Sequence, residues 1–598
     1  MSDEAPRFGP LIAADQVHFR VWAPGADQIE LEIEGRSRVP MRRRADGFHE
    51  VAVEAGEGTR YRFHKGEIAF PDLAARQQDV DTKGWSVVRA PMKPPPRETR
   101  PWHEAVICEI HIGTATPEGT FRALRDRLEH FRDAGYTCLE IMPVNECPGA
   151  RNWGYDGTLI FAPDSAYGSP EDLRDLVTRA HELGLIMILD VVYNHFGGVD
   201  NFAAEIAPEW FDQSVDTPWG PGIDFARPEV RRFYYENAVM WVNEYGFDGL
   251  RFDAVHEIKT DQRDRFLGEL AEAVRKVRPD ARLIIENMDN AAHWLERNDR
   301  NEPMTYTAQW NEDIHHVLAF IVTGEGNKTG YDDPDKDPIA DLEKALTQGF
   351  VHDREEGDHS DGHTRGGPAG ELPPDSFITY VENHDQIGNR ADGRRLSSRI
   401  SPEQIDFLHF VKFISPQIPL CFMGDEANFD SSFPFFVDLD EVEGEKANQR
   451  RYKEMREMFK EDVEEGDLPH PNDPATFAAA KLPWDDYRAE PHRDALRRFR
   501  ELAGYRRDKV WPLTATPCLD AISVRSGSGL IVNWVFEAGV LTLALNPSPL
   551  PVDMACIIMG TPVSTGSFDQ LGDVLRLGPW SAVAWRSDRA EPLCDFYA

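Results

Sequence analysis

The sequence predicts a (β/α)8 barrel with a small antiparallel β domain before it and a second one after it. In the middle of the chain, apolar runs alternate with amphipathic helical stretches, and both ends carry short runs of period two. The 598 residues are also enough for several domains. We place an N-terminal β-sandwich domain at 1–90, a barrel with insertions and associated helices at 91–512, and a C-terminal antiparallel β domain at 513–598.

Short alternating runs at 17–22, 29–33 and 61–63, separated by Gly and Pro, predict the strands of the first domain. The segment 91–97 contains four prolines and predicts an extended linker. The barrel strands follow as apolar runs at 105–112, 137–144, 186–194, 249–255, 283–287, 305–311, 377–385 and 418–426.

Helices are expected between these runs, because hydrophobic residues recur there at three- and four-residue spacing. They fall at 121–134, 170–183, 229–245 and 261–277. A doubly wound open sheet is the alternative fold, but no Gly-rich phosphate loop follows any strand.

Beyond the sixth strand the pattern weakens. The stretch 331–374 predicts a long loop with one helix near 339–349, and 438–485 predicts helices and loops outside the barrel. A closing helix is expected at 495–506, before alternation returns at 530–535 and 540–544.

Composition restricts the partners. Lys and Arg number 65 against 104 Asp and Glu, a net charge of −39, which disfavours nucleic acid and anionic membranes. The same charge equally fits an acidic surface that only keeps the protein solvated and monomeric, so we infer no partner from it. The seven cysteines show no Cys-x-x-Cys spacing, which argues against a disulfide framework or a zinc site. Residues 1–10 have no apolar core, and no run of eighteen apolar residues occurs, so we expect a cytoplasmic protein outside the membrane.

Polar residues gather at the ends of the otherwise apolar barrel strands. Side chains alternate across a strand, so Arg251 and Asp253 point to the same face. Alone, that pair could be a structural ion pair. In a barrel, however, the C-terminal strand ends face one mouth. The other polar residues at these ends are Asp190, Asn194, His195, His256, Glu286, His384 and Asp385.

Converging carboxylates without clustered metal ligands suit the cleavage of a glycosidic bond. One carboxylate attacks the anomeric carbon, and a second, kept protonated, donates to the leaving oxygen. A two-metal carboxylate site is the competing chemistry, but it would need ligand-spaced Asp, Glu and His pairs rather than an aspartate held by Arg251.

Four segments in this order resemble glycoside hydrolase family 13, the α-amylase family. They are Asp190-Val-Val-Tyr-Asn-His195, Gly249-Leu-Arg-Phe-Asp-Ala-Val-His256, Ile285-Glu286-Asn287 and Glu382-Asn-His-Asp385. The stretch 17–24 is similar to the β-sandwich carbohydrate module of that family, so the resemblance covers nearly the whole chain. It implies an α-glucan substrate and no required cofactor or metal.

The resemblance also implies roles. Asp253 would be the nucleophile that forms a covalent β-glucosyl intermediate, Glu286 the general acid and then base, and Asp385 the residue that grips the sugar hydroxyls. Arg251 would orient Asp253, and two displacements would retain the α configuration. Tyr155, in Trp153-Gly-Tyr-Asp-Gly157, resembles a tyrosine that stacks on the same sugar. The candidate substrate-binding residues are Tyr155, Asp190, His195, Arg251, His256, Asp313, His384 and Arg390.

Further segments are similar to the branch of the family that cleaves the α-1,4 bond next to the terminal trehalose of malto-oligosyltrehalose. They are Cys108-Glu-Ile-His-Ile-Gly-Thr114, Thr116-Pro-Glu-Gly-Thr-Phe121, Asp313-Ile-His-His316, and Asn383-His-Asp-Gln-Ile-Gly-Asn-Arg390. Three departures stand out: Glu312 replaces the first aspartate of a pair, Ala427 replaces the usual aromatic in Met423-Gly-Asp-Glu-Ala-Asn428, and 441–465 lacks the usual Gly-Arg pattern. Another α-1,4-glucan hydrolase, a glucanotransferase or branching enzyme, and a glucan-binding protein with an inactive barrel remain as alternatives.

Overall fold

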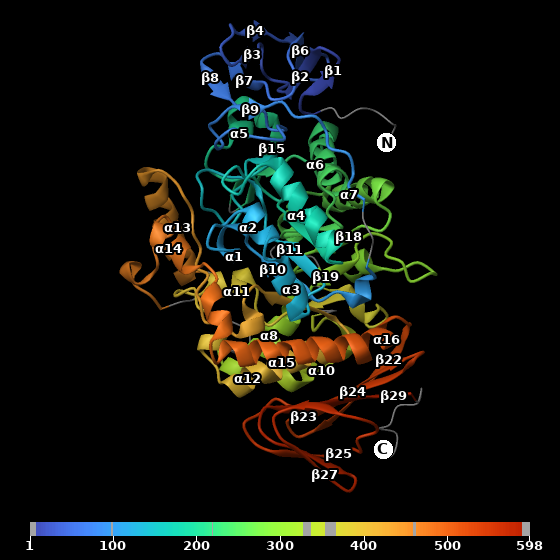
Figure 1. The fold of residues 1–598 in the computed structure, drawn as a ribbon. Helices are drawn as coiled ribbons and strands as arrows, with labels where there is room; N and C mark the ends of the chain where they lie inside the picture. The colour runs from blue at the N-terminus through green and yellow to red at the C-terminus, as the bar shows by residue number, and fades with distance from the viewer. Residues whose placement is uncertain are drawn as a thin grey trace.

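A closed barrel of eight parallel strands forms the centre of the molecule (Figure 1). The computed structural model describes residues 8–96, 100–217, 219–326, 336–352, 366–457 and 462–588. The predicted barrel is confirmed, because the first strand pairs with the eighth and closes the sheet. In barrel order the strands are β10 (Ile107–Ile110), β11 (Cys138–Ile141), β14 (Ile186–Val191), β17 (Gly249–Phe252), β18 (Arg282–Ile285), β19 (Ala308–Trp310), β20 (Phe377–Thr379) and β21 (Ile418–Phe422).

Helices cover the barrel. In α4 (Pro170–Glu182), Ser169 and Asp172 form a capping box, and Leu173, Leu176 and Val177 lie buried on one face. The single helix predicted at 121–134 is wrong: α2 (Phe121–Arg125) and α3 (Leu128–Ala134) are separate, because the backbone at Arg127 leaves the helical region. The other long barrel helices are α6 (Pro228–Met240), α7 (Arg263–Val277), α8 (Glu312–Thr323), α10 (Pro338–Gln348), α12 (Pro402–Ile414) and α15 (His492–Tyr505).

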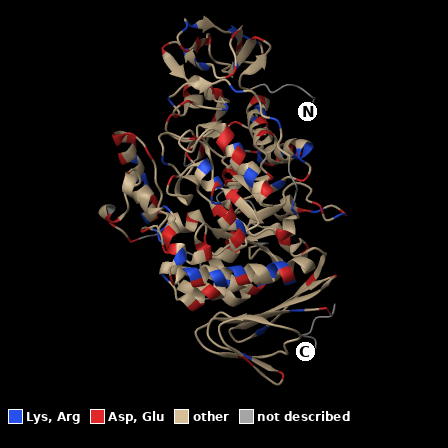
Figure 2. Cartoon of the chain, in the orientation of Figure 1, with Lys and Arg blue, Asp and Glu red and all other residues tan. Residues whose placement is uncertain are grey.

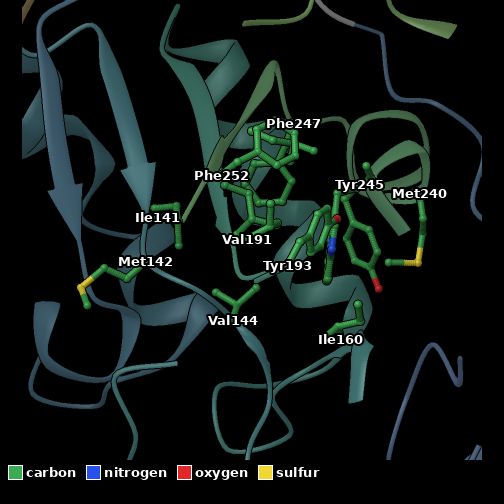
Figure 3. Packing of buried hydrophobic residues seen from close by; sticks show 14 of the residues in the cluster. Ile141, Met142, Val144, Ile160, Val191, Tyr193, Met240, Tyr245, Phe247 and Phe252 are labelled. Atoms are coloured by element: carbon green, nitrogen blue, oxygen red, sulfur yellow. The ribbon is translucent and has the colours of Figure 1, made fainter. Parts of the chain in front are cut away.

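Strand β17 shows the alternation on which the site depends. Arg251 points into the barrel and is fully buried, whereas Phe252 points outward into an apolar cluster with Val191 and Tyr193 (Figure 3). Gly249 starts the strand where a Cβ would lie 1.8 Å from the carbonyl oxygen of Arg282, so only glycine fits there.

Two antiparallel sheets form the N-terminal domain, in the orders β1-β2-β6-β5 and β4-β3-β7-β8, with β9 beside β7. Their inner faces bury Val17, Phe19 and Phe63, and a buried ion pair of 3.0 Å between Arg76 and Glu244 joins this domain to the barrel. The strands are β1 (Leu11–Ala13), β2 (Gln16–Trp22), β3 (Glu30–Ile33), β4 (Val39–Pro40), β5 (Arg42–Arg43), β6 (Phe48–Glu54), β7 (Arg60–Lys65), β8 (Ile68–Phe70) and β9 (Ser86–Val87).

The C-terminal domain also has two antiparallel sheets, in the orders β22-β23-β24-β29-β26 and β25-β28-β27. Trp534 on β23 donates a 3.0 Å hydrogen bond to the carbonyl of Leu346 on α10, which attaches the larger sheet to the barrel helices. The predicted boundary after residue 512 falls inside α16 (Trp511–Thr514). The strands are β22 (Cys518–Ser526), β23 (Gly529–Phe536), β24 (Gly539–Asn546), β25 (Val552–Ala555), β26 (Val563–Thr565), β27 (Phe568–Leu571), β28 (Val574–Leu577) and β29 (Ser581–Ser587).

Between β21 and α15, the chain forms an arm beside the barrel (Figure 1). It carries α13 (Glu441–Glu457) and α14 (Pro474–Ala479), as predicted for 438–485. The helix expected near 339–349 is α10, whereas 331–335 and 353–365 of the predicted loop lie outside the described residues, as does Arg97 of the predicted linker.

Charged residues of both signs cover the barrel helices, and α15 shows both along its length (Figure 2). Within the described ranges, every helix is too short or too polar to cross a membrane.

Candidate active site

The carboxyl ends of the barrel strands bring the predicted carboxylates to one cavity of about 330 Å³. Asp253 directly follows β17, and Glu286 directly follows β18. The seventh strand ends earlier than predicted, at Thr379, and His384 and Asp385 begin the short helix α11 (His384–Gly388). Lining side chains include Trp153, Tyr155, His195, Trp219, Asp253, Glu286, His384, Asp385, Asn389, Phe435, Arg450, Arg451 and Glu454.

Arg251 joins three carboxylates, of which Asp253 and Glu286 line the cavity and Asp190 is buried. Its Nη1 donates to Asp190 Oδ1 at 3.0 Å, to Asp190 Oδ2 at 2.8 Å and to Asp253 Oδ1 at 2.8 Å. Its Nη2 donates to Glu286 Oε2 at 2.8 Å. The guanidinium also lies 4.1 Å from the ring centre of Trp310. Because a planar guanidinium fixes its partners in direction, it sets the relative positions of the three carboxyls.

Asp253 has a second support in Asn194, whose Nδ2 donates to the Asp253 carboxylate at 2.7 Å and to its carbonyl at 2.9 Å. Burial raises the pKa of Asp253, while Arg251 acts in the opposite direction. The next residue, Ala254, has φ of +37°, a left-handed conformation that is rare for a side chain with a Cβ.

Ala254 connects the two facing carboxylates. Ala254 directly follows Asp253 in the chain and has a left-handed backbone conformation. Its N–H donates to Glu286 Oε2 at 2.8 Å. The hydrogen bonds that Ala254 and Arg251 donate to the Glu286 carboxyl both reach Oε2. Oε1 takes part in neither of these two hydrogen bonds.

His384 carries a positive charge between two carboxylates. Its Nδ1 contacts Glu109 Oε1 at 2.5 Å, and its Nε2 lies 3.4 Å from Asp385 Oδ1. Burial lowers the pKa of His384, but Asp385 and Glu109 raise it well above its ordinary value. Burial likewise opposes ionisation of Asp385, yet the charge of His384 lowers the pKa of Asp385.

Aromatic rings form the wall beside these groups. Tyr155 stacks on His384 with ring centres 5.0 Å apart, and its hydroxyl donates to Asp190 Oδ2 at 2.7 Å. His195 stacks on Trp219 at 4.0 Å, and its Nε2 lies 3.0 Å from the carbonyl of Tyr155. Burial lowers the pKa of His195 to about 4, so its ring is neutral.

Five of the eight predicted binding residues do not line the cavity. Asp190 and Arg251 are buried and act through the hydrogen bonds described above, whereas the other three lie elsewhere. His256 lies in the turn after β17, with its Nδ1 3.3 Å from the N–H of Met288. Asp313 is buried and accepts hydrogen bonds from Val351 and His352, so it holds the loop after α10. Arg390 pairs with Glu325 at 2.9 Å. Proximity in sequence to a motif therefore did not guarantee a place in the cavity wall.

No site role was predicted from the sequence for Glu109, Asn194, Glu312, Trp219 or the cavity-facing side of α13. Two of them carried a usable signal. Glu109 is a carboxylate in an otherwise apolar barrel strand, and Asn194 ends the third predicted strand beside His195. Trp219 and α13 belong to insertions between barrel elements, and the local sequence pattern does not determine where such insertions lie in space.

In the part of the chain that the structure describes, no group of three or more His, Cys, Asp or Glu side chains is arranged to hold a metal ion.

Comparisons with known proteins agree with this architecture. Residues 73–219 match the alpha amylase catalytic domain. The chain is 32% identical over 559 residues to a malto-oligosyltrehalose trehalohydrolase of Saccharolobus solfataricus, covering 90% of this chain and 94% of the relative. It is 33% identical over 530 residues to one of Deinococcus radiodurans, covering 85% and 84%. A crystal structure from Salmonella typhimurium, assigned as an alpha amylase, superposes with a TM-score of 0.91 at 34% identity, covering 98% of this chain and 100% of that one.

Proposed function

The chain belongs to the malto-oligosyltrehalose trehalohydrolases of the α-amylase family, and from this premise we propose that it hydrolyses the α-1,4 bond next to the terminal trehalose of malto-oligosyltrehalose. The observation that carries the proposal is the attachment of Asp253 and Glu286 to opposite nitrogens of one buried guanidinium, with Asp385 in the same cavity.

In the first proposed step, Asp253 attacks the anomeric carbon of the glucosyl unit as the bond to the leaving oxygen breaks. Glu286 gives its proton to that oxygen, and trehalose departs. Two carboxyls bound to one guanidinium support the close spacing, about 5–5.5 Å, that a retaining enzyme needs. In the second step, Glu286 takes a proton from water, the water oxygen attacks the same carbon, and Asp253 is released.

Asp385 is proposed to hold two sugar hydroxyls as the ring flattens, because the charge of His384 keeps it ionised and ready to accept hydrogen bonds. Tyr155 and His195 would complete the wall around the same sugar. No metal ion or cofactor is required for these steps.

The test uses malto-oligosyltrehalose and the malto-oligosaccharide of equal length as separate substrates, with products separated by chromatography. We expect trehalose from the first substrate and much slower cleavage of the second. Equal or faster cleavage of the malto-oligosaccharide would refute the trehalose specificity, and longer or branched products would identify a glucanotransferase. Asp253→Ala should abolish turnover of both substrates, with Asp212→Ala, an exposed carboxylate, as the control.

A further inference from the structure

Glu312 occupies a part of the barrel mouth that the cavity does not include. It is the first residue of α8 and lies two positions beyond the end of β19. Strand β19 pairs with β18 on one side and β20 on the other, and these strands precede Glu286 and Asp385. Among the described residues, the cavity wall includes side chains that follow β18 and β20 but none that follows β19. Glu312 therefore stands beside the cavity, between Glu286 and Asp385 in barrel order.

Neighbouring side chains hold the Glu312 carboxyl in place. Tyr380 donates its hydroxyl to Oε2 at 3.1 Å, and Gln386 Nε2 donates to Oε1 at 3.3 Å. His316, one turn along α8, approaches Oε1 at 3.5 Å. The side chain remains 21% exposed. A carboxylate has about four lone-pair positions, so the structure fixes this group while leaving acceptor capacity toward the mouth.

The catalytic carboxylates act on Glu312 electrostatically. Burial and the negative charges of Glu286 and Asp385 together raise the pKa of Glu312 to about 7. The three carboxyls therefore share one low-dielectric region. A group with this pKa exchanges between a form that only accepts hydrogen bonds and a form that also donates one, which suits contact with a sugar hydroxyl.

We propose that Glu312 binds the leaving trehalose, through a hydroxyl of the glucosyl unit next to the cleaved bond. This inference rests on the proposed function. Glu286 delivers its proton to the oxygen on C4 of that unit, and the C3 hydroxyl and the C6 hydroxymethyl group flank this oxygen. A carboxyl that stands between Glu286 and Asp385 in barrel order, outside the lining of the cavity, is placed to contact those groups.

The experiment measures trehalose as a product inhibitor of malto-oligosyltrehalose hydrolysis, and the hydrolysis of α-maltosyl fluoride. Fluoride leaves without a sugar hydroxyl, so its release does not use the proposed contact. For Glu312→Ala we expect trehalose inhibition to weaken roughly 10- to 100-fold, the worth of a hydrogen bond to a charged group, and fluoride release to change less than about twofold. Glu312→Gln keeps the shape and one acceptor oxygen for Gln386, while its NH2 group can donate to the Tyr380 hydroxyl, so it should weaken inhibition less. Glu403→Gln, an exposed carboxylate on α12, should leave both measurements unchanged.

Two results would overturn the inference. The first is unchanged trehalose inhibition in both Glu312 variants. The second is an equal loss of fluoride and oligosaccharide hydrolysis, which would show that Glu312 only supports Glu286 or Asp385. A wild-type enzyme that prefers malto-oligosaccharide would instead refute the proposed function, so the two failures are distinguishable.

Discussion

Replacing Arg251 with methionine tests whether one guanidinium organises the site. Methionine keeps a long unbranched side chain but removes the charge and the four hydrogen bonds to Asp190, Asp253 and Glu286. Removing one partner of a buried ion pair costs about 3–5 kcal/mol, because the remaining charges are left unpaired. If the loss falls on the transition state, kcat/KM for malto-oligosyltrehalose should decrease roughly 10²- to 10⁴-fold.

The same variant should have a pH-dependent stability defect. Burial raises the pKa of Asp190 to about 7 in the wild type, with Arg251 opposing the rise. The raised pKa means that protonated Asp190 favours folding below its unfolded pKa, and that this stability is lost as the pH rises through about 7. Without Arg251 the folded pKa rises further, so the deficit relative to wild type should grow above pH 7.

Thermal unfolding at pH 5 and pH 8, together with the activity assay, measures both effects. Arg265→Met removes an exposed arginine that pairs with Glu269 at 2.8 Å, and it should change neither measurement appreciably. An Arg251→Met enzyme within tenfold of wild-type activity, with the same loss of stability at both pH values, would show that Arg251 does not organise the three carboxyls.

Substitutions at three further positions test two contacts and one backbone conformation. Asn194→Ala removes two hydrogen bonds to Asp253. It should lower kcat/KM roughly 10- to 100-fold and change the melting temperature only slightly, and a decrease in kcat/KM of less than twofold would contradict this. Glu109→Gln removes a negative charge that raises the pKa of His384, so His384 should lose its proton at a lower pH. The decrease of kcat/KM at alkaline pH should therefore begin at a lower pH than in the wild type. An unchanged alkaline part of the pH profile would show that Glu109 does not tune His384. Ala254→Gly should leave the melting temperature unchanged or higher, whereas Ala254→Val should destabilise by about 1–3 kcal/mol because φ is +37°; equal melting temperatures would show that this conformation is not strained.

The barrel could be predicted because its signal is repeated. Each strand is a buried apolar run, and closure follows from eight such runs with helices between them. The ends of the strands could not be predicted as well as their number. The seventh strand was expected to continue to Asp385, whereas it ends at Thr379 in the structure. The chain must leave the sheet there so that Asn383 can cap α11, a hydrogen-bonding requirement that hydrophobicity does not reveal.

The carboxylate positions were predictable for the same reason, since residues at or just past a strand end have a fixed direction. Arg251 and Asp253 are two apart, and they do meet at 2.8 Å. Residues further along the loops were not predictable in this way. Asp313 follows β19 by three residues, yet its side chain turns to the N–H groups of Val351 and His352, while its neighbour Glu312 faces Tyr380 and Gln386. Two adjacent residues at the start of α8 therefore have different roles: Asp313 anchors a loop, and Glu312 is a candidate binding residue.

The excess of carboxyls over cations at this mouth fits the charge that the proposed reaction develops. An oxocarbenium-like transition state is positive, so fixed negative groups stabilise it and fixed positive groups oppose it. The two cations that contact the strand-end carboxylates are each matched: Arg251 by Asp190, Asp253 and Glu286, and His384 by Glu109 and Asp385. His195, on the wall of the same cavity, has its pKa lowered to about 4 and adds no charge. Burial keeps His195 neutral, whereas Asp385 stays ionised because the charge of His384 outweighs the effect of burial. A cationic side chain introduced at position 195 would oppose the developing charge, and we expect it to lower kcat more than it raises KM.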